Sequence, residues 1–309
     1  MRVLTLTANL LAETTCEYDG WQAGGTFRAF SESFQAGGKG INVTRMLRRL
    51  GVPTVALCFP GGFTGSRCEA WLGGAGVPHH AFRTLQETRS GWVVRAAGRR
   101  ETTFLGADNV VDESAAAACA QFLDTQTAKD CLAICGSIPH WEDAVWTELR
   151  HALERWSARV PLVADTYGEP LRWLAALPCA LVKINRREFA ELAGEPRRAA
   201  TDARMPELLA RAAGSRPVQR WVVTDGANRV WSMERDGAPF SVVPPRIQEV
   251  SPTGSGDVLL AALLEALFAR KLSLAEALEF ALPLGAANAA SPGVADFDLT
   301  PFRLVDQST

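Results

Sequence analysis

The second half of the chain alternates continuous apolar runs with longer amphipathic segments, and this regular order limits the folds that it can adopt. The predicted strands are residues 131–135, 161–165, 180–184 and 221–224, and the predicted helices lie near residues 112–127, 141–157 and 187–213. A strand that is apolar at every position is buried on both faces, as in a parallel sheet covered by helices on either side. The alternation therefore predicts an α/β fold with three layers and a mostly parallel central sheet.

Two segments of the first half have a different pattern. Residues 14–34 carry three glycines among aromatic and polar residues, which indicates short strands and turns. Residues 91–105 contain two β-rich runs separated by Ala97-Gly98, and this arrangement predicts a hairpin. We expect the two segments to form a small β-sheet lid beside the main body, within a single domain that spans residues 1–309.

Charge and composition argue against several classes of partner. The net charge of −2 is unlike that of a general nucleic-acid binder. The seven cysteines are scattered without a CxxC pair, so neither a disulfide framework nor a zinc site is indicated. The first residues lack the apolar core of a signal peptide, and no run is long enough to cross a bilayer. We therefore expect a cytoplasmic protein with no membrane or nucleic-acid partner.

A small-residue loop at residues 251–257 leads directly into a strongly apolar helix at residues 258–264. The first amides of a helix lack intrahelical partners, and the glycines on both sides of Ser255 let an anion approach them. Asp257 would repel a bound phosphate, but it fits a transition-state anion if it removes a proton from the attacking group. The alternative is an ordinary aspartate favoured by the helix dipole, and this stretch alone does not decide between the two.

A second glycine-rich loop at residues 35–42 also precedes residues with helical spacing. It is not a P-loop, because Lys39 is followed by glycine and the required upstream glycine is absent. A tight turn between strand and helix would explain the glycines equally well. Lys39, held among three glycines, is nonetheless well placed to meet an anion.

Ligands on parallel sheets collect at the carboxyl ends of the strands. The polar residues just beyond the predicted strands are Asn9, Ser137, Asp165, Asn185 and Thr224. Most such residues are ordinary turn formers, so this position alone assigns them no role.

Four motifs in order give the chain its resemblance to the ribokinase/PfkB family of carbohydrate kinases. They are Gly37–Asn42, Lys183–Glu188, Thr253–Asp257 and Gly285–Ala289. Each motif alone is weak, whereas four in sequence over essentially the full length are highly specific. The resemblance implies a ribokinase-like fold and ATP-dependent phosphorylation of a sugar hydroxyl, with Mg²⁺ on the phosphates.

The resemblance also implies roles for individual residues. Asp257 would take the proton of the attacking hydroxyl, and the amides of Gly254, Ser255 and Gly256 would stabilise the transferring phosphoryl group. The nucleotide would be bound by Lys183, Asn185, Thr224, Gly226 and Asn288, the last near the base. Glu188, with Asn185, would organise Mg²⁺ through water, although the same N-x-x-E spacing is also that of a helix capping box.

Within the family, the chain most resembles the branch that acts on phosphorylated hexoses, which includes 1-phosphofructokinases and tagatose-6-phosphate kinases. The matching phrases are Gly37–Val43, Glu87–Arg89 and Cys135–Pro139. In this branch Lys39 and Arg89 would contact the phosphate that the substrate already carries, and an ammonium with a guanidinium fork suits that task. The other implied substrate-binding residues are Asn9, Glu13, Gly37, Gly38, Asn42 and Ser137.

Three departures from the branch leave the substrate open. Glu13 stands where the branch has an aspartate that grips substrate hydroxyls, and it reaches about one methylene further. Residues 105–109 lack the usual N-x-P-G segment. Arg229 replaces a second glycine near the nucleotide, and it would be strained if that position requires a positive φ.

Three functions follow from these observations. The first is a kinase of a sugar phosphate, and the second is a kinase of an unphosphorylated sugar or nucleoside. Lys39 and Arg89 argue against the second function, while Glu13 keeps it open. The third is a regulatory protein that binds a sugar phosphate without turnover, although a binder has no need of Asp257. The lid is expected to exclude water, and it offers a possible homodimer interface.

Overall fold

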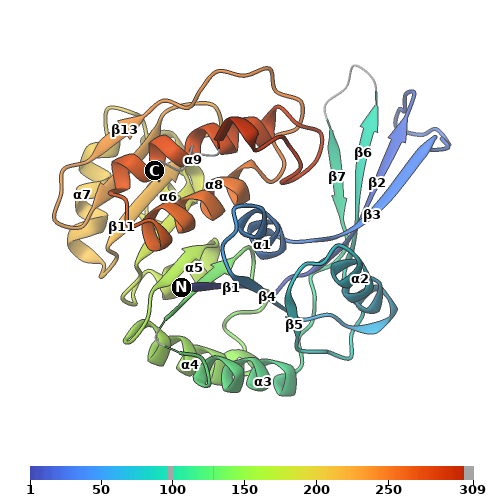
Figure 1. The fold of residues 1–309 in the computed structure, drawn as a ribbon, viewed down its shortest axis with the longest axis horizontal. Coiled ribbons are helices and arrows are strands. Elements are labelled where there is room, and N and C mark those ends of the chain that lie inside the picture. Colours follow the sequence, from blue (N-terminus) through green and yellow to red (C-terminus); the bar gives the residue numbers. More distant parts are fainter. Residues whose placement is uncertain (97–100, 128, 303–309) are drawn as a thin grey trace, which may run out of the picture.

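The computed structural model describes residues 1–96, 101–127 and 129–302, and its largest element is a twisted sheet (Figure 1). Within these residues the sheet has nine strands in the order β13-β12-β11-β10-β9-β8-β1-β4-β5. The strands are β1 (Arg2–Thr7), β4 (Thr54–Cys58), β5 (His79–Ala81), β8 (Asp130–Cys135), β9 (Leu162–Asp165), β10 (Leu181–Asn185), β11 (Arg220–Thr224), β12 (Val230–Glu234) and β13 (Phe240–Val242). Neighbours from β5 to β11 pair in parallel, and β12 and β13 add an antiparallel end.

Both faces of this sheet are buried, and β8 shows why its sequence is continuously apolar. Alternate residues of a strand point to opposite faces. Cys131 and Ala133 accordingly pack in one hydrophobic cluster, whereas Leu132 and Ile134 pack in the other. A polar residue at any of these positions would lose its water without gaining a partner.

Helices cover the two faces and complete the three layers, as predicted. One layer consists of α1 (Lys39–Arg49), α8 (Ser255–Leu264) and α9 (Leu274–Ala289). The opposite layer consists of α3 (Glu113–Asp124), α4 (Thr147–Ser157), α5 (Gly168–Leu174), α6 (Arg186–Leu192) and α7 (Met205–Ser215). The helix expected from residue 141 begins only at Thr147, because a 3-10 turn at Ala144–Trp146 precedes it. None of the helices in the described part of the chain has the length and apolar character needed to cross a membrane.

A second, smaller sheet stands beside the main body (Figure 1, right). It has the order β3-β2-β6-β7 and comprises β2 (Leu11–Tyr18), β3 (Ser31–Gly37), β6 (Ser90–Ala96) and β7 (Thr102–Leu105). We call it the lid sheet. The antiparallel pairing of β6 with β7 confirms the predicted hairpin, whose Ala97-Gly98 turn lies outside the described residues. Its base packs on α2 (Gly62–Gly74) in a third apolar cluster.

Two features of the sheets differ from the sequence-based expectations. Residues 19–30 form the connection between β2 and β3, so residues 14–34 contribute less strand than expected. The pattern also gave no indication that β2 and β6 pair in parallel across the lid sheet, or that β5, β12 and β13 extend the large one. These strands are short, and their pairing depends on neighbours that lie far away in the sequence.

The lid sheet is bonded to the loop that precedes α8. Glu101, just before β7, accepts hydrogen bonds from Thr253 Oγ1 at 2.8 Å and Ser251 Oγ at 3.4 Å. Arg95 of β6 pairs with Glu101 at 2.8 Å and donates to the carbonyl of Pro292 at 2.7 Å. We call this set of bonds the lid latch. It ties the lid sheet to the loop before α8 and to the segment that follows α9.

Replacing Glu101 by alanine should loosen the lid sheet without unfolding the protein. The variant removes the acceptor of three hydrogen bonds, each contributing about 1 kcal/mol. Hydrogen exchange of the β6 and β7 amides should become about 3- to 10-fold faster. Glu69→Ala breaks the surface pair with Arg83 and serves as the control. Equal exchange in parent and Glu101→Ala would show that the latch does not hold the lid sheet.

Candidate active site

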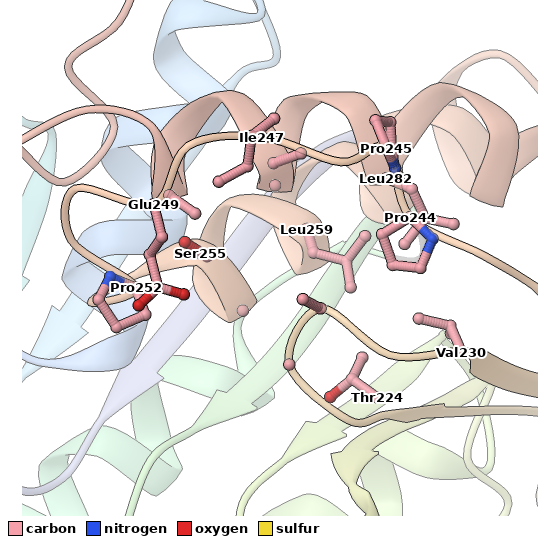
Figure 2. A pocket seen from close by; sticks show the side chains of 16 residues that line it. Thr224, Val230, Pro244, Pro245, Ile247, Glu249, Pro252, Ser255, Leu259 and Leu282 are labelled. Atoms are coloured by element: carbon pink, nitrogen blue, oxygen red, sulfur yellow. The ribbon is translucent and has the colours of Figure 1, made fainter.

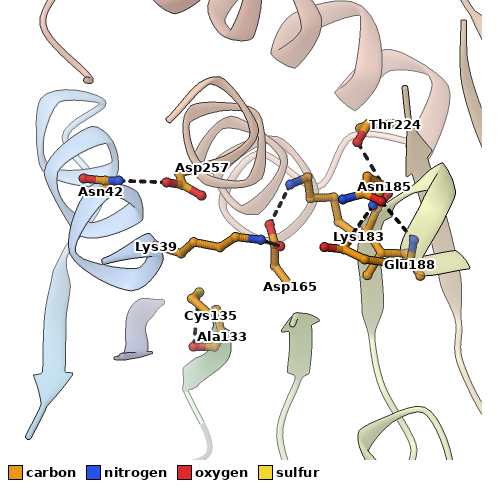
Figure 3. Close-up of polar contacts among 11 residues, drawn as sticks. Lys39, Asn42, Ala133, Cys135, Asp165, Lys183, Asn185, Glu188, Thr224 and Asp257 are labelled. Atoms are coloured by element: carbon orange, nitrogen blue, oxygen red, sulfur yellow. Dashed lines mark hydrogen bonds and ion pairs between the residues drawn. The ribbon is translucent and has the colours of Figure 1, made fainter. Parts of the chain in front are cut away.

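A polar cavity of about 410 Å³ opens at the edge where the parallel strands end (Figure 3). Charged and amide side chains line it together with glycines of two loops: Gly38, Lys39, Asn42, Asp165, Lys183, Asn185, Glu188, Thr224, Thr253, Gly254, Gly256 and Asp257. These residues come from β9, β10 and β11, from the first turns of α1, α6 and α8, and from the loops that precede α1 and α8. Both glycine-rich loops therefore meet at one site, as the sequence predicted.

The loop before α8 is shaped by glycine and held by a buried amide. Gly254 caps α8 with φ of 76°, and a Cβ atom there would lie 2.3 Å from Val294 Cγ1, so no other residue fits. Asn288 of α9 is fully buried and donates from Nδ2 to Thr253 O at 2.9 Å and to Ser255 Oγ at 3.1 Å. Its Oδ1 accepts from the amide of Ala295 at 2.7 Å. The loop is therefore fixed before any ligand binds.

Asp257 lies in the first turn of α8, and its side chain is buried in the cavity wall. Asn42 Nδ2 donates to Asp257 Oδ2 at 2.8 Å. Burial raises the pKa of Asp257 to about 6, and the charge of Asp165 adds to the rise, although Lys39 and the Asn42 bond oppose it. A carboxylate with a pKa near neutrality is a far better proton acceptor than an exposed aspartate.

Asp165 at the end of β9 joins the two lysines of the cavity. Its oxygens accept from Lys39 Nζ at 2.8 Å and from Lys183 Nζ at 2.6 Å. Burial alone would raise the pKa of Asp165, but the two ammonium groups outweigh it and lower the pKa. Burial would likewise lower the pKa of Lys39, but Asp165 and Asp257 raise it, so Lys39 stays charged.

Positive groups gather where an anion would meet the start of α8. A Cβ atom on Gly256 would lie 3.0 Å from Lys183 Nζ, so the absence of a side chain at Gly256 lets the ammonium group lie against the loop. The amide of Ser255, one of three proposed anion donors, donates to Pro252 O at 3.2 Å. Within the described residues, no backbone acceptor faces the amides of Gly254 and Gly256. These two amides and Lys183 form the candidate anion site.

Asn185 and Glu188 form the reciprocal capping box that their spacing allows. Asn185 Oδ1 accepts from the Glu188 amide, and Glu188 Oε2 accepts from the Asn185 amide, both at 2.9 Å. Both residues also line the cavity. No group of three His, Cys, Asp or Glu side chains that could hold a metal occurs within the described residues. The donors present suit Mg²⁺ held through water and phosphate rather than a cage of protein ligands.

A second cavity, of about 200 Å³, shares Thr224 and Gly256 with the first (Figure 2). Its remaining walls are mostly apolar side chains: Val230, Pro244, Pro245, Ile247, Pro252, Leu259 and Leu282. Gly226 borders it with φ of 58°. The strain expected at Arg229 is absent, because this arginine does not have a positive φ and donates to Ser241 Oγ at 2.9 Å.

A third group of polar residues lies under the lid sheet. Asn9 Nδ2 donates to Ser137 Oγ at 2.8 Å and to Asp108 Oδ1 at 2.7 Å. Arg89 Nη1 donates to the same Asp108 oxygen at 3.1 Å. We call these four residues the arginine cluster. It adjoins the cavity, since a Cβ atom on Gly136, the residue before Ser137, would lie 3.6 Å from the Lys39 side chain.

Glu13 of β2 lies on the adjacent part of the lid sheet. It accepts a short hydrogen bond from Gln35, whose own oxygen accepts from Arg45 at 3.1 Å. A Cβ atom on Gly37 would lie 3.2 Å from Glu13 Oε2, so the carboxylate packs against the first glycine-rich loop. The absence of a side chain at Gly37 thus makes room for Glu13, which is longer than the aspartate of the branch.

The structure brings together most of the predicted site residues, but it separates Lys39 from Arg89 and places Asn288 away from the cavities. Lys39 is bonded to Asp165, whereas Arg89 belongs to the arginine cluster. Asn288, proposed near the base, lies behind the loop and is not among the residues lining either cavity. Sequence reasoning assigned no role to two residues of these sites, Asp165 and Asp108. Asp165 had a signal, its position at a strand end, while Asp108 had only a departure from a family motif.

Comparison with known proteins identifies the family of this chain. Residues 11–300 match the pfkB family carbohydrate kinases. The 1-phosphofructokinase of Borreliella burgdorferi is 29% identical over 306 residues, which cover 96% of this chain and 94% of that protein. The structure of phosphofructokinase-2 from Escherichia coli in complex with fructose-6-phosphate has a TM-score of 0.85 and 23% identity, and the match covers 93% of each chain.

A third match is the Arabidopsis thaliana ribokinase complexed with ribose and ATP. It has a TM-score of 0.71 and 19% identity, and the match covers 95% of this chain and 94% of that one. The two structural matches confirm the ribokinase-like fold. The chain belongs to the pfkB family of carbohydrate kinases, and membership of a kinase family implies ATP as a substrate.

Replacing Asp257 by asparagine should stabilise the folded protein at neutral pH. Because folding raises the pKa of this carboxyl from 3.8 to about 6, stability is lost as the pH rises through that interval and stays lost above it. The loss amounts to about 2–3 kcal/mol. Asp257→Asn should therefore raise the free energy of unfolding by about 2 kcal/mol at pH 7.5, with the difference vanishing near pH 4.

Denaturant unfolding at several pH values measures this difference. Asp124→Asn is the control, because Asp124 is on the surface of α3 and pairs with Arg155 of α4. A variant that is less stable than the parent at pH 7.5 would contradict the argument from burial.

Proposed function

We propose that this protein transfers the terminal phosphoryl group of ATP to a hydroxyl group of a phosphorylated hexose. The observation that carries the proposal is the buried Asp257, with its raised pKa, beside two lysines and the start of α8. A protein that only binds sugar phosphates gains nothing from burying an unpaired carboxylate there. The similarity to a 1-phosphofructokinase supports the choice of acceptor.

The proposed reaction uses the chain's own groups for proton transfer and charge stabilisation. Asp257 accepts the proton of the acceptor hydroxyl as its oxygen forms a bond to the terminal phosphorus. The bond from that phosphorus to the bridging oxygen breaks, and ADP leaves. The amides of Gly254 and Gly256, together with Lys183, stabilise negative charge on the transferred group. The amide of Ser255 also stabilises this charge if its hydrogen bond to Pro252 O breaks.

The two adjoining cavities suit the two parts of the nucleotide. The apolar cavity accepts the adenosine, with Thr224 and Gly226 on its border. The phosphates then extend past Thr224 and Gly256 into the polar cavity. Asn185 and Glu188 would hold Mg²⁺ through water, and the ion would neutralise phosphate charge when bound. Asn288 acts by holding the loop rather than by touching the base.

The acceptor occupies the opposite side of Asp257. Arg89, Asn9 and Ser137 bind its phosphate, while Glu13 and Asn42 face its hydroxyls. Lys39 lies between the phosphates of ATP and the phosphate of the acceptor. Its ammonium group contacts Asp165 in the cavity, and its side-chain carbons lie next to Gly136, the residue before Ser137. Gly37 and Gly38 give the sugar close access to the backbone.

An unphosphorylated sugar remains the second candidate acceptor. Two carboxylates, those of Glu13 and Asp108, face the region where the acceptor would bind, and carboxylates suit neutral hydroxyls. The ribokinase match shows that the same fold accommodates ribose in another protein. An ATP-consumption screen over fructose, tagatose and their monophosphates separates the two candidates, with Asp257→Asn as the blank.

The lid sheet also supports a proposed homodimer. Its strands β6 and β7 expose Trp92, Phe104 and Leu105, each about half accessible to solvent. Exposed aromatic and aliphatic groups on one sheet favour self-association.

A cytoplasmic location stays a prediction.

Asp257→Asn should lose turnover while it retains nucleotide binding. An asparagine cannot accept the proton, so kcat should fall by about 10²–10⁴. In the parent, kcat/KM for the acceptor should fall about tenfold per pH unit below the pKa of Asp257 in the free enzyme, about 6. Turnover near that of the parent in Asp257→Asn would refute the mechanism.

Arg89→Ala and Lys39→Ala should weaken binding of a phosphorylated acceptor. Each variant removes a charge-assisted hydrogen bond, so KM should rise by about 10- to 100-fold, with little change for an unphosphorylated sugar. Arg155→Ala removes an arginine of a surface pair and is the matched control. If the KM for sugar phosphates stays the same in both site variants, these residues do not bind the acceptor's phosphate.

A further inference from the structure

The carboxylate of Asp108 occupies an unexpected place in the arginine cluster. One of its oxygens, Oδ1, accepts from both Arg89 Nη1 at 3.1 Å and Asn9 Nδ2 at 2.7 Å. These donors belong to residues that we propose bind the acceptor's phosphate. An anionic oxygen of the protein itself thus uses the donors that a phosphate oxygen would use.

The two partners of this ion pair differ in how firmly they are held. Arg89 is mostly buried, with 13% of its side chain exposed, and Nη2 also donates to Asn9 O at 3.3 Å. Arg89 Nε is buried and has no hydrogen-bond acceptor within the described residues. Asp108, in contrast, is 54% exposed. The arginine is therefore fixed and has an unused donor, while the carboxylate can move into solvent.

The backbone of the loop does not depend on the Asp108 carboxylate. Its neighbour Asn109 is buried and accepts from the amide of Arg89 at 2.6 Å. The Asn109 amide donates to Asn9 Oδ1 at 3.1 Å, and Nδ2 donates to Leu10 O at 2.8 Å. Three bonds from one residue anchor the loop, so the position of Asp108 is set before its own side chain makes any contact.

We propose that Asp108 occupies the position of the acceptor's phosphate in the free enzyme and is displaced by it, which makes Asp108 a specificity-determining residue. This inference rests on the proposed function of Arg89. A phosphate dianion forms two charge-assisted bonds with a guanidinium fork and can use the free Nε donor. A sugar acid would only replace the Asp108 carboxylate at Arg89 with a carboxylate of its own. The contact between Asp108 and Arg89 therefore favours phosphorylated acceptors over sugar acids.

The contact between Asp108 and Arg89 also weakens the binding of phosphate. Any phosphate that approaches Arg89 must break two bonds of Asp108 and is repelled by its charge. Removing the charge while keeping the shape should therefore strengthen binding of a phosphate. If Asp108 instead holds Arg89 in the correct orientation, removing its charge should weaken binding.

The test compares Asp108→Asn with the parent on fructose 1-phosphate and fructose 6-phosphate. For the better of the two substrates, KM should fall about 5- to 20-fold in Asp108→Asn, with kcat and the KM for ATP unchanged. Inhibition by inorganic phosphate should strengthen by a similar factor. Asp124→Asn is the matched control, because it neutralises an aspartate paired with Arg155 far from this site. Asp108→Ala repeats the test without an amide that could bond to Arg89.

The outcomes separate this inference from the proposed function. An unchanged or higher KM in both Asp108 variants would overturn the inference, provided that Arg89→Ala still raises KM. If Arg89→Ala has no effect and fructose is the better acceptor, the proposed function fails and the inference fails with it. In the double variant Asp108→Asn/Arg89→Ala, the gain from Asp108→Asn should disappear, since it acts through the arginine. A gain that persists without Arg89 would also overturn the inference.

Discussion

The bridge from Lys39 through Asp165 to Lys183 is the interaction on which the chemistry of this site depends. Two ammonium groups beside Asp257 would, if unpaired, hold its pKa low and make it a weak base. Asp165 cancels much of their charge, so the burial of Asp257 prevails and its pKa rises. Lys39 nonetheless remains charged, because Asp165 and Asp257 raise its pKa. A single carboxylate thus lets the site hold a base and two cations together.

The fold makes this bridge possible by bringing strand ends to one edge. Asp165 and Lys183 belong to the neighbouring strands β9 and β10, whereas Lys39 and Asp257 come from α1 and α8 in the helical layer above. Glycine allows these elements to approach closely. Gly256 lets α8 pack closely against Lys183, because a glycine has no Cβ atom to occupy the space of the lysine's ammonium group. The positions of the charges are consequently set by backbone packing.

The sequence predicted what depends on local pattern. Continuous apolar strands and glycine-rich helix starts identified the parallel sheet and the position of Asp257, because both are encoded within a few consecutive residues. Pairings between distant segments were not predictable in this way. Asp165 was noticed only as a residue at a strand end, and nothing in the sequence indicated that it bridges two lysines. Asp108 and the short strands β5, β12 and β13 are also defined by tertiary neighbours.

The lid latch has a consequence for how the nucleotide is protected. Glu101 of the lid region accepts hydrogen bonds from the hydroxyls of Thr253 and Ser251, in the loop whose amides we propose stabilise the terminal phosphate. If the lid sheet opened to admit a sugar, these hydroxyls would lose their acceptor and the loop would lose part of its support. We infer that ATP bound to the open form is a poor target for water, because the groups that would stabilise hydrolysis are not yet in place. The enzyme would then spend ATP on sugar and little of it on solvent.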